Sequence, residues 1–513
     1  MTSKAPMSLQ ELAEALPSML RKVVGDGQVQ ITGVQHDSRL VGPGDLFFAL
    51  GGQVFDGADY TADAIARGAV AIAAEQVLQV DVPQVQVNHG LLALAHAARL
   101  VYGDPTRGLR VAGVTGTNGK TTVAHLVEQA LLALGERPGL AGTVTVRGPG
   151  GDRAPTHTTP MADELMRIAR WLVDSGATHF VMEASSHGMA MHRVDGVRFD
   201  VAAFTNLSQD HLDFHGDLIS YGAAKARLFT ELKPRVAVIN LDDEFGRQLS
   251  RRVESQRPGT SLRYSARGDR DAELSVIQVA QGRAGLQATI ETPEGAVDLQ
   301  SPLLGMHNLE NLTCALGICM GLGFPAEDAA RALGSASGAP GRLERVPHPE
   351  DVLVFVDYAH TPDALERVCT LLKESTAGRL LVLFGCGGDR DRTKRPLMGE
   401  VVGRFAEIAF LTSDNPRGES PSAIIDDIVP GLLRAGVTAL SVDALSQVKA
   451  RGFLVEPDRG LAIGLALQAA RPGDTVLIAG KGHEKVQIVG TERLAFDDVE
   501  EAAKAIARTR EGA

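Results

Sequence analysis

The chain has 513 residues, of which 44% are hydrophobic, 22% are charged and 56 are glycine. This length is too great for one hydrophobic core, and usual domain sizes predict about three domains of an α/β protein. The 51 Lys and Arg residues against 63 Asp and Glu residues leave a formal charge of -12, which opposes binding to nucleic acid and to anionic membranes.

The N-terminal segment MTSKAPMSLQELAEALPSML carries Glu11 and Glu14 among its leucines, so we expect no signal peptide. No later run reaches the roughly 20 apolar residues of a membrane span. The cysteines show no CxxC pair and no metal-ligand spacing, which favours buried, reduced thiols at Cys314, Cys319, Cys369 and Cys386. These features predict a cytoplasmic protein.

Two stretches rich in Gly, Pro and Ser, at residues 102–110 and 334–342, are typical of exposed linkers. They predict domains over residues 1–104, 105–342 and 343–513. In the second and third domains, continuously apolar runs alternate with amphipathic helical segments, which predicts mainly parallel sheets covered on both faces. Polar clusters follow these runs, at the strand ends where ligands bind in such sheets.

The segment RVAGVTGTNGKTTVAHLVEQALLALG, residues 110–135, predicts a strand, a glycine-rich turn and a helix. Glycines let backbone N–H groups surround phosphate oxygens, while Lys120 brings a cation to the outer phosphates and the Thr121 hydroxyl can bind Mg²⁺. Val114 stands where the usual phosphate-loop pattern has its first glycine. We expect ATP to contact Gly116, Thr117, Asn118, Gly119, Lys120, Thr121 and Thr122.

This variant loop, GxxGTNGKTT at residues 113–122, resembles the nucleotide loop of the Mur ligase family. Members of that family join a carboxylate to an amine through an acyl phosphate, with ATP as co-substrate. The resemblance covers nearly the whole chain. It implies an α/β fold with a smaller N-terminal α/β domain that binds a UDP-linked substrate, a central P-loop ATPase domain with a mainly parallel sheet, and a C-terminal Rossmann-like domain that binds an amino acid.

A second polar cluster contains Glu183 and the segment DHLDFH, residues 210–215. His211 and His215 alone could suggest zinc, but the carboxylate neighbours and the phosphate loop favour Mg²⁺. From the residues alone, Lys225 reads as a phosphate-binding or surface lysine, whereas YGAAKARLF resembles the family segment whose lysine carries a CO₂-derived carbamate. The resemblance implies metal ligands at Thr121, Glu183, His211 and carbamylated Lys225, and catalytic residues at Lys120, Glu183, His211 and Lys225.

Three further segments resemble nucleotide contacts of the family. Asn308 and Asn311 lie three residues apart in GMHNLENL, and the resemblance favours Asn308 for ATP, although an isolated Asn on a helix is more often solvated or a cap. GRLERV supplies Arg342 at the second linker, and FVDYAHTPDAL supplies Asp357 and His360. Closure of the third domain at this linker would exclude water from a hydrolysable intermediate.

In the third domain, GCGGDRDRTKRP, SDNPRGE and AGKGHE each follow an apolar run and predict one amino-acid pocket. Asp414 and Glu484 suit amines, and arginine side chains suit carboxylates. The intact DNPR motif resembles the diaminopimelate-adding branch of the family and implies contacts from Arg390, Asp414, Asn415, Pro416, Arg417, Gly480 and Glu484. Lysine has no distal carboxylate for Arg417, so we predict a preference for meso-diaminopimelate.

The sugar-nucleotide peptide is expected between the first and second domains. By resemblance, its contacts are Ser38, Gln53, Val54, Phe55, His157, Thr158, Thr159, Ser185, Met191 and Arg193. His157 stands where related sequences often carry Asn, and Met191 where Gln is frequent.

The implied reaction adds meso-diaminopimelate to the D-glutamyl side-chain carboxylate of UDP-N-acetylmuramoyl-L-alanyl-D-glutamate during synthesis of peptidoglycan precursors. It needs ATP, Mg²⁺ and the carbamate on Lys225. We expect a monomer that binds these small molecules and no nucleic acid. Two alternatives stay open: a related carboxylate-amine ligase, such as a lysine-adding muramyl ligase or folylpolyglutamate synthetase, and a regulatory P-loop nucleotide switch.

Overall fold

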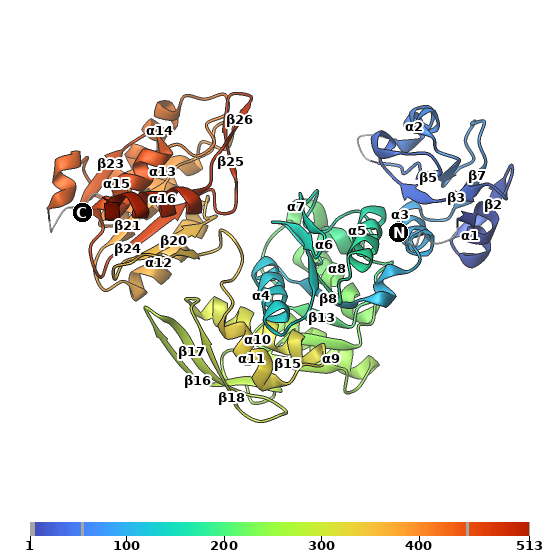
Figure 1. The fold of residues 1–513 in the computed structure, drawn as a ribbon, viewed down its shortest axis with the longest axis horizontal. Coiled ribbons are helices and arrows are strands. Elements are labelled where there is room, and N and C mark those ends of the chain that lie inside the picture. The colour runs from blue at the N-terminus through green and yellow to red at the C-terminus, as the bar shows by residue number, and fades with distance from the viewer. Residues whose placement is uncertain (1–5, 53–55, 448–450, 512–513) are drawn as a thin grey trace. The chain divides into compact units, whose positions relative to one another are not determined.

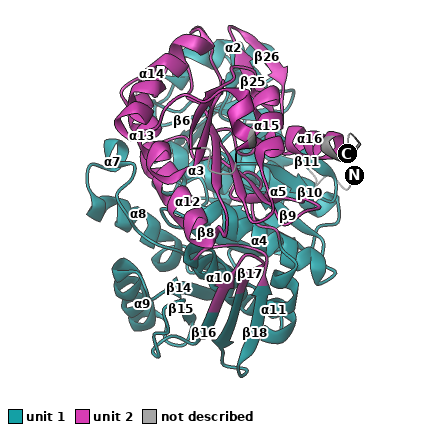
Figure 2. Cartoon of the chain, turned by 90° about the vertical axis from the view of Figure 1, so that its left-hand side faces the viewer, with its two compact units in different colours: residues 1–279, 287–300, 306–336 teal, residues 280–286, 301–305, 337–513 magenta. Residues whose placement is uncertain are grey.

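The computed structural model describes residues 6–52, 56–447 and 451–511. The chain divides into two compact units (Figure 2): unit 1 holds residues 1–279, 287–300 and 306–336, and unit 2 holds residues 280–286, 301–305 and 337–513. The predicted sugar-nucleotide contacts Gln53, Val54 and Phe55 lie outside the described residues.

The N-terminal part of unit 1 is built on a five-stranded sheet in the order β2-β7-β6-β5-β4 (Figure 1). β2 runs antiparallel to β7, and the other neighbours are parallel. Its strands are β2 (Leu20–Val24), β4 (Gly33–Gln35), β5 (Asp45–Phe48), β6 (Ala71–Ala74) and β7 (Gln84–Val87), with a separate antiparallel pair of β1 (Met7–Ser8) and β3 (Gln30–Ile31). The helices here are α1 (Leu9–Ala15), α2 (Thr61–Arg67) and α3 (Gly90–Val101).

The central sheet has eleven strands in the order β11-β10-β9-β12-β8-β13-β14-β15-β16-β17-β18. The run from β9 to β16 is parallel, and β10 and β11 extend it antiparallel. The strands are β8 (Arg110–Thr115), β9 (Pro138–Ala141), β10 (Val146–Gly148), β11 (Gly151–Arg153), β12 (His179–Glu183), β13 (Val201–Phe204), β14 (Val236–Asn240), β15 (Ser261–Ser265), β16 (Leu274–Gly282), β17 (Gly285–Glu291) and β18 (Val297–Ser301). The helices are α4 (Lys120–Ala133), α5 (Ala162–Asp174), α6 (Ser186–Ala190), α7 (Leu212–His215), α8 (Leu218–Thr230), α9 (Glu244–Gln256), α10 (Met306–Gly321) and α11 (Ala326–Gly334).

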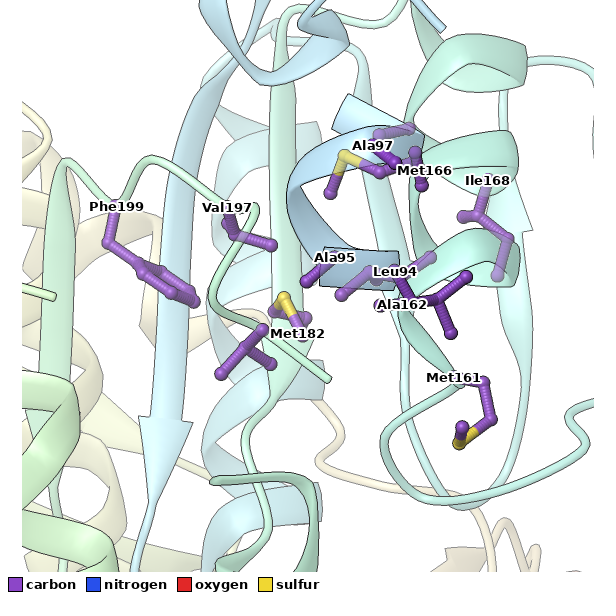
Figure 3. Packing of buried hydrophobic residues seen from close by; sticks show 14 of the residues in the cluster. Leu94, Ala95, Ala97, Met161, Ala162, Met166, Ile168, Met182, Val197 and Phe199 are labelled. Carbon is purple, nitrogen blue, oxygen red and sulfur yellow. The ribbon is translucent and has the colours of Figure 1, made fainter. Parts of the chain in front are cut away.

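One hydrophobic cluster runs from the N-terminal sheet into the central sheet of unit 1. Leu94, Ala95 and Ala97 of α3 belong to it together with Met166 and Ile168 of α5 (Figure 3). The alanines of α3 let the backbones of packed helices approach closely, because they add little volume at the contact. The two parts of unit 1 therefore share a continuous core.

Unit 2 contains a six-stranded sheet in the order β19-β20-β24-β21-β22-β23. β19 is antiparallel to β20, and the other neighbours are parallel. The strands are β19 (Glu344–Val346), β20 (Leu353–Asp357), β21 (Leu380–Phe384), β22 (Ile408–Leu411), β23 (Gly452–Val455) and β24 (Thr475–Ala479), followed by the hairpin β25 (Val486–Val489) and β26 (Glu492–Ala495). The helices are α12 (Pro362–Ser375), α13 (Lys394–Phe405), α14 (Pro421–Arg434), α15 (Arg459–Ala469) and α16 (Asp498–Glu511).

Two hydrophobic cores cover the two faces of the unit 2 sheet. In β21, Leu380, Val382 and Phe384 belong to the core that includes α12, α13 and α14. Leu381 and Leu383 belong to the core that includes α15 and α16. Because successive side chains of a strand point to opposite faces, a strand buried on both faces must be apolar throughout. This explains the continuous apolar runs of the sequence.

The predicted α/β class, with mainly parallel sheets, is confirmed. The domain limits at residues 104 and 342 remain predictions. All four cysteines are buried free thiols, as predicted, and burial raises the pKa of each to about 12. Within the described ranges, no helix is both long and apolar enough to cross a membrane.

Candidate active site

The predicted phosphate loop lies between the end of β8 and the start of α4, which begins at Lys120. Gly119 has φ +88°, a left-handed conformation that strongly favours glycine. A Cβ atom at Gly119 would lie 2.5 Å from Oδ1 of Asn311. The free backbone N–H groups at the start of a helix attract anions. The loop therefore has the local geometry of a phosphate site.

Two lysines converge on this loop from different helices. Nζ of Lys120 donates to the carbonyl oxygens of Gly116 at 3.0 Å and Thr117 at 2.9 Å. Nζ of Lys225, on α8, donates to the same Gly116 oxygen at 2.8 Å and lies 4.2 Å from the ring centroid of Tyr221. Burial, together with the charge of Lys120, lowers the pKa of Lys225 to about 6. At neutral pH this buried lysine is therefore largely an uncharged amine.

Glu183 ends β12 beside the loop. Its carboxylate accepts hydrogen bonds from Oγ1 of Thr121 at 2.9 Å and from the backbone N–H of Thr143 at 2.7 Å. The side chain is buried, with 1% of the residue exposed. The structure thus brings together two predicted metal ligands, a hydroxyl and a carboxylate, and such oxygen donors suit Mg²⁺.

His211 lies beside Asp210, His187 and Tyr221. Its Nε2 is 3.5 Å from Oδ2 of Asp210, and its side chain is 48% exposed. Its ring centroid lies 4.8 Å from that of His187 and 6.2 Å from that of Tyr221, the residue that also contacts Lys225. Among the described residues, no group of three or more His, Cys, Asp or Glu side chains could hold a metal ion. The metal role of His211 therefore stays a prediction.

The loop is braced by residues for which the sequence analysis predicted no role. Oγ1 of Thr205 donates to the Asn118 carbonyl at 2.6 Å, and Oδ1 of Asn206 accepts from the Asn118 N–H at 2.9 Å. The N–H of Ser208 donates to Oγ1 of Thr117 at 3.0 Å. These residues follow β13, which neighbours β8 in the sheet. Their position directly after an apolar run was the sequence feature that could have predicted a place at the site. Thr122 lies in the first turn of α4.

The two predicted amides of α10 are both buried, and Nδ2 of Asn311 donates to Oδ1 of Asn308 at 3.3 Å. The family resemblance favoured Asn308. The structure places Asn311 against the phosphate loop at Gly119. We therefore add Asn311 to the candidate nucleotide residues.

The predicted sugar-nucleotide contacts of unit 1 form a polar network next to Glu183. Oγ1 of Thr159 lies 2.9 Å from the Glu183 carbonyl oxygen and 3.0 Å from Oγ of Ser185, which begins α6 as its N-cap. Nη1 of Arg193 donates to the Thr159 carbonyl at 2.8 Å.

The other predicted sugar-nucleotide contacts of unit 1 differ in their partners and in their exposure. Oγ1 of Thr158 lies 3.1 Å from Oγ1 of Thr143, and Nη2 of Arg193 lies 3.1 Å from the sulfur of Met191. His157 is exposed, whereas Ser38 is buried at the start of a 3-10 turn, Ser38–Leu40.

Arg342 and Asp357 lie in unit 2. The carboxylate of Asp357 accepts from the backbone N–H groups of Leu343 at 2.7 Å and Ala359 at 2.8 Å, and burial raises its pKa. The guanidinium carbon of Arg342 lies 5.2 Å from the ring centroid of Tyr358, and Nδ1 of His360 lies 2.8 Å from the Tyr358 carbonyl oxygen. Asp357 thus fixes the backbone that carries Arg342.

The three predicted amino-acid motifs meet at the carboxyl ends of β21, β22 and β24, which are neighbours in the sheet. Nδ2 of Asn415 donates to Oε2 of Glu484 at 2.8 Å. Nη1 of Arg417 donates to the Gly388 carbonyl at 3.0 Å, and the Gly388 N–H donates to the Asn415 carbonyl at 2.9 Å. Arg390, on the loop after β21, is exposed.

Asp414 is also buried in this group. Its Oδ1 is buried and has no hydrogen-bond donor within the described part of the chain. Gly480 faces it, since a Cβ atom there would lie 3.8 Å from the carboxyl carbon of Asp414. Oδ1 has an ion-pair partner in Lys481 at 3.7 Å but no hydrogen bond, and a buried carboxylate oxygen in this state favours a bound donor such as an ammonium group.

Two buried cations near this group were missed by the sequence analysis. Lys481 is fully buried beside Asp414 and Glu484. Arg395, also fully buried, donates to the Glu419 carboxylate at 2.7 and 2.8 Å and to the Gly387 carbonyl at 3.2 Å. Arg395 therefore connects the loop after β21 to the loop after β22. In the sequence, Arg395 is one charged residue inside a polar motif. That pattern alone does not distinguish a buried ion pair from a solvated side chain.

Three family models match the chain: "Mur ligase family, catalytic domain" at residues 30–102, "Mur ligase middle domain" at 114–319 and "Mur ligase, glutamate ligase domain" at 341–482. The UDP-N-acetylmuramoyl-L-alanyl-D-glutamate--2,6-diaminopimelate ligase of Geobacter metallireducens is 43% identical, covering 97% of this chain and 98% of its own. Its Pseudomonas aeruginosa counterpart is also 43% identical, with 98% of each chain covered.

A solved structure of a ligase with that name is 33% identical and has a TM-score of 0.74, covering 98% of this chain and 99% of that chain. The UDP-N-acetylmuramoylalanyl-D-glutamyl-2,6-diaminopimelate--D-alanyl-D-alanyl ligase from Acinetobacter baumannii shares the fold, with 18% identity, a TM-score of 0.61 and 100% of both chains covered. The matches extend over the phosphate loop of unit 1 and the strand-end motifs of unit 2. The chain therefore belongs to the Mur ligase family.

Proposed function

We propose that this protein adds meso-diaminopimelate to the D-glutamyl side-chain carboxylate of UDP-N-acetylmuramoyl-L-alanyl-D-glutamate, using ATP. Support comes from relatives named UDP-N-acetylmuramoyl-L-alanyl-D-glutamate--2,6-diaminopimelate ligase, which align over nearly the whole chain. The observation that carries the proposal is the arrangement at the strand ends of unit 2, where Asp414, Asn415 and Glu484 are held together and Arg417 lies on the adjoining loop. These groups suit a substrate with both amines and carboxylates.

The reaction would proceed in two displacements. A carboxylate oxygen of the substrate attacks the terminal phosphorus of ATP, ADP leaves, and an acyl phosphate forms. The amine nitrogen then attacks the acyl carbon, phosphate leaves, and the amine loses a proton. Lys120 and the loop N–H groups would stabilise the charge on the transferred phosphoryl group, so this loop contributes positioning and electrostatic stabilisation.

We further propose that Thr121, Glu183, His211 and a carbamylated Lys225 hold Mg²⁺. Two observations support this proposal: Thr121 and Glu183 hold their oxygen atoms close together, and Lys225 is buried beside Lys120. The neutral amine of Lys225 is the form that reacts with CO₂, giving a carbamate and releasing one proton. The carbamate would offset the charge of Lys120 and supply oxygen ligands. When bound, Mg²⁺ would neutralise charge on the ATP phosphates.

The test is a product assay. The purified protein is incubated with Mg-ATP, the muramyl dipeptide nucleotide and each candidate amino acid, and the product is identified by mass. We expect an amide of meso-diaminopimelate. Comparable turnover with L-lysine would overturn the substrate assignment, and nucleotide hydrolysis that needs neither small molecule would favour a nucleotide switch.

The predicted cytoplasmic location and monomeric state accompany this proposal and remain predictions.

A further inference from the structure

Lys481 is a buried cation at the end of β24, in the AGKGHE segment. None of its surface is exposed. A buried ammonium is costly unless charged or polar partners surround it. Its Nζ lies 3.1 Å from Oδ1 of Asn415, 3.4 Å from Oε2 of Glu484 and 3.7 Å from Oδ1 of Asp414. All three partners belong to the candidate amino-acid pocket.

The ammonium of Lys481 fixes the orientation of the Asn415 amide. Oδ1 of Asn415 accepts from two donors, Nζ of Lys481 and the backbone N–H of Ile488 at 2.9 Å. A carbonyl oxygen can accept both, whereas the NH₂ group of a rotated amide would face two donors. The amide nitrogen therefore faces Glu484 and holds its carboxylate at 2.8 Å.

Lys481 also offsets part of the negative charge on this side of the pocket. Within this cluster of three side chains, the two carboxylates of Asp414 and Glu484 and the one ammonium of Lys481 leave a net charge of one negative. Arg459, a further buried cation of this region, is already paired with Asp498 at 2.7 Å. Oδ1 of Asp414 still has no hydrogen-bond donor among the described residues. This combination leaves a place for one added cationic donor.

We propose that Lys481 is a positioning residue that sets the amine specificity of the pocket: it orients Asn415 and Glu484 and balances their charge, so that the pocket accepts one ammonium group. The inference rests on the proposed function and goes beyond it, because it assigns a role to a residue that is itself fully buried. A purely structural lysine would affect folding and leave the binding of the amino acid unchanged.

The test compares Lys481→Met with Lys485→Met. Lys485 is four residues away, its side chain is 66% exposed, and it pairs with Asp497, so the control removes the same charge from the same segment. KM is measured for meso-diaminopimelate, ATP and the muramyl dipeptide nucleotide. Lys481→Met removes the charge-assisted contacts of Lys481 with Asn415 and Glu484. Because these contacts position both side chains, their loss should raise the KM for diaminopimelate by at least about 10-fold. The other two KM values, and every KM of the control, should stay within about twofold.

A double variant separates positioning from folding. If Lys481 acts through Glu484, the substitutions Lys481→Met and Glu484→Gln remove the same interaction. The double variant should then raise the KM for diaminopimelate no more than the more impaired of the two single variants does. Lys481→Gln, whose amide can still donate to Asn415, serves as the second variant and carries the test if Lys481→Met does not fold. It should raise the KM for diaminopimelate by a smaller factor, since the hydrogen bond remains and the charge is lost.

Three results would overturn the proposal: a diaminopimelate KM within twofold of the parent value, equal increases in all three KM values, or multiplicative losses in the double variant. Failure of the proposed function has a different signature, because the unmodified protein would then not use diaminopimelate. In that event the same variants are compared with the amino acid that the protein does use.

Discussion

Arg459 and Asp498 form an ion pair beneath the amino-acid pocket, and its removal should strongly destabilise unit 2. Both residues are fully buried. Nε and Nη2 of Arg459 each donate to the Asp498 carboxylate at 2.7 Å, and Nη2 also donates to the Ala479 carbonyl, at the end of β24, at 3.0 Å. Arg459→Met would leave a buried, unpaired carboxylate.

Breaking such a pair costs about 3–5 kcal/mol. At 1.36 kcal/mol per factor of ten, this corresponds to a roughly 150- to 5,000-fold increase in the population of opened states. The matched control is Arg404→Met in the same unit. Arg404 pairs with Glu366 at 3.1 Å, but the two side chains are 49% and 45% exposed, so the expected cost is below about 1 kcal/mol.

The assay is hydrogen exchange of the backbone amides in β22 and β24, because it reports local opening without requiring two-state unfolding of the whole chain. Exchange should accelerate by at least about 100-fold in Arg459→Met and by less than about fivefold in Arg404→Met. Replacing both partners, in Arg459→Met with Asp498→Leu, should recover much of the loss. Equal acceleration in the two single variants would refute the reasoning.

Four further predictions concern the candidate sites. Gly119→Ala should raise the KM for ATP, because a left-handed backbone with a Cβ costs about 1–2 kcal/mol and Asn311 must move; an unchanged KM would contradict this. The folded-state pKa of Lys225 is about 6, below its usual 10.5, so its neutral amine predominates above that pH, and turnover should fall as the pH drops through about 6. Lys225→Ala should be rescued by added short-chain carboxylates, and full activity without them would remove Lys225 from the mechanism. Arg417→Met should reduce the preference for diaminopimelate over lysine by about 10- to 100-fold, measured as the ratio of kcat/KM values.

Local patterns were sufficient to predict some features. The strand, glycine turn and helix around Lys120 depend on neighbouring residues, and the sequence predicted all three elements. The meeting of the loops that carry Asn415 and Glu484 followed from the rule that ligands bind at the carboxyl ends of parallel strands.

Other features depended on long-range packing. Lys481 and Asn415 are 66 residues apart, and nothing in either segment indicates that one buries its charge against the other. The choice between Asn308 and Asn311 requires the rotational position of α10 relative to Gly119, which a single sequence does not fix. The bracing of Asn118 by Thr205 likewise joins segments 87 residues apart.

In unit 2, different parts of the chain supply the candidate substrate contacts and the packed sheet, and this has a consequence for evolution. The candidate amino-acid contacts lie on loops after β21, β22 and β24, while the strands themselves are buried between two apolar cores. Mutations in those loops can alter recognition of the incoming amino acid without disturbing the sheet, because loops tolerate change better than packed strands. Descendants of one ancestral chain could thus acquire new substrates while inheriting the same scaffold.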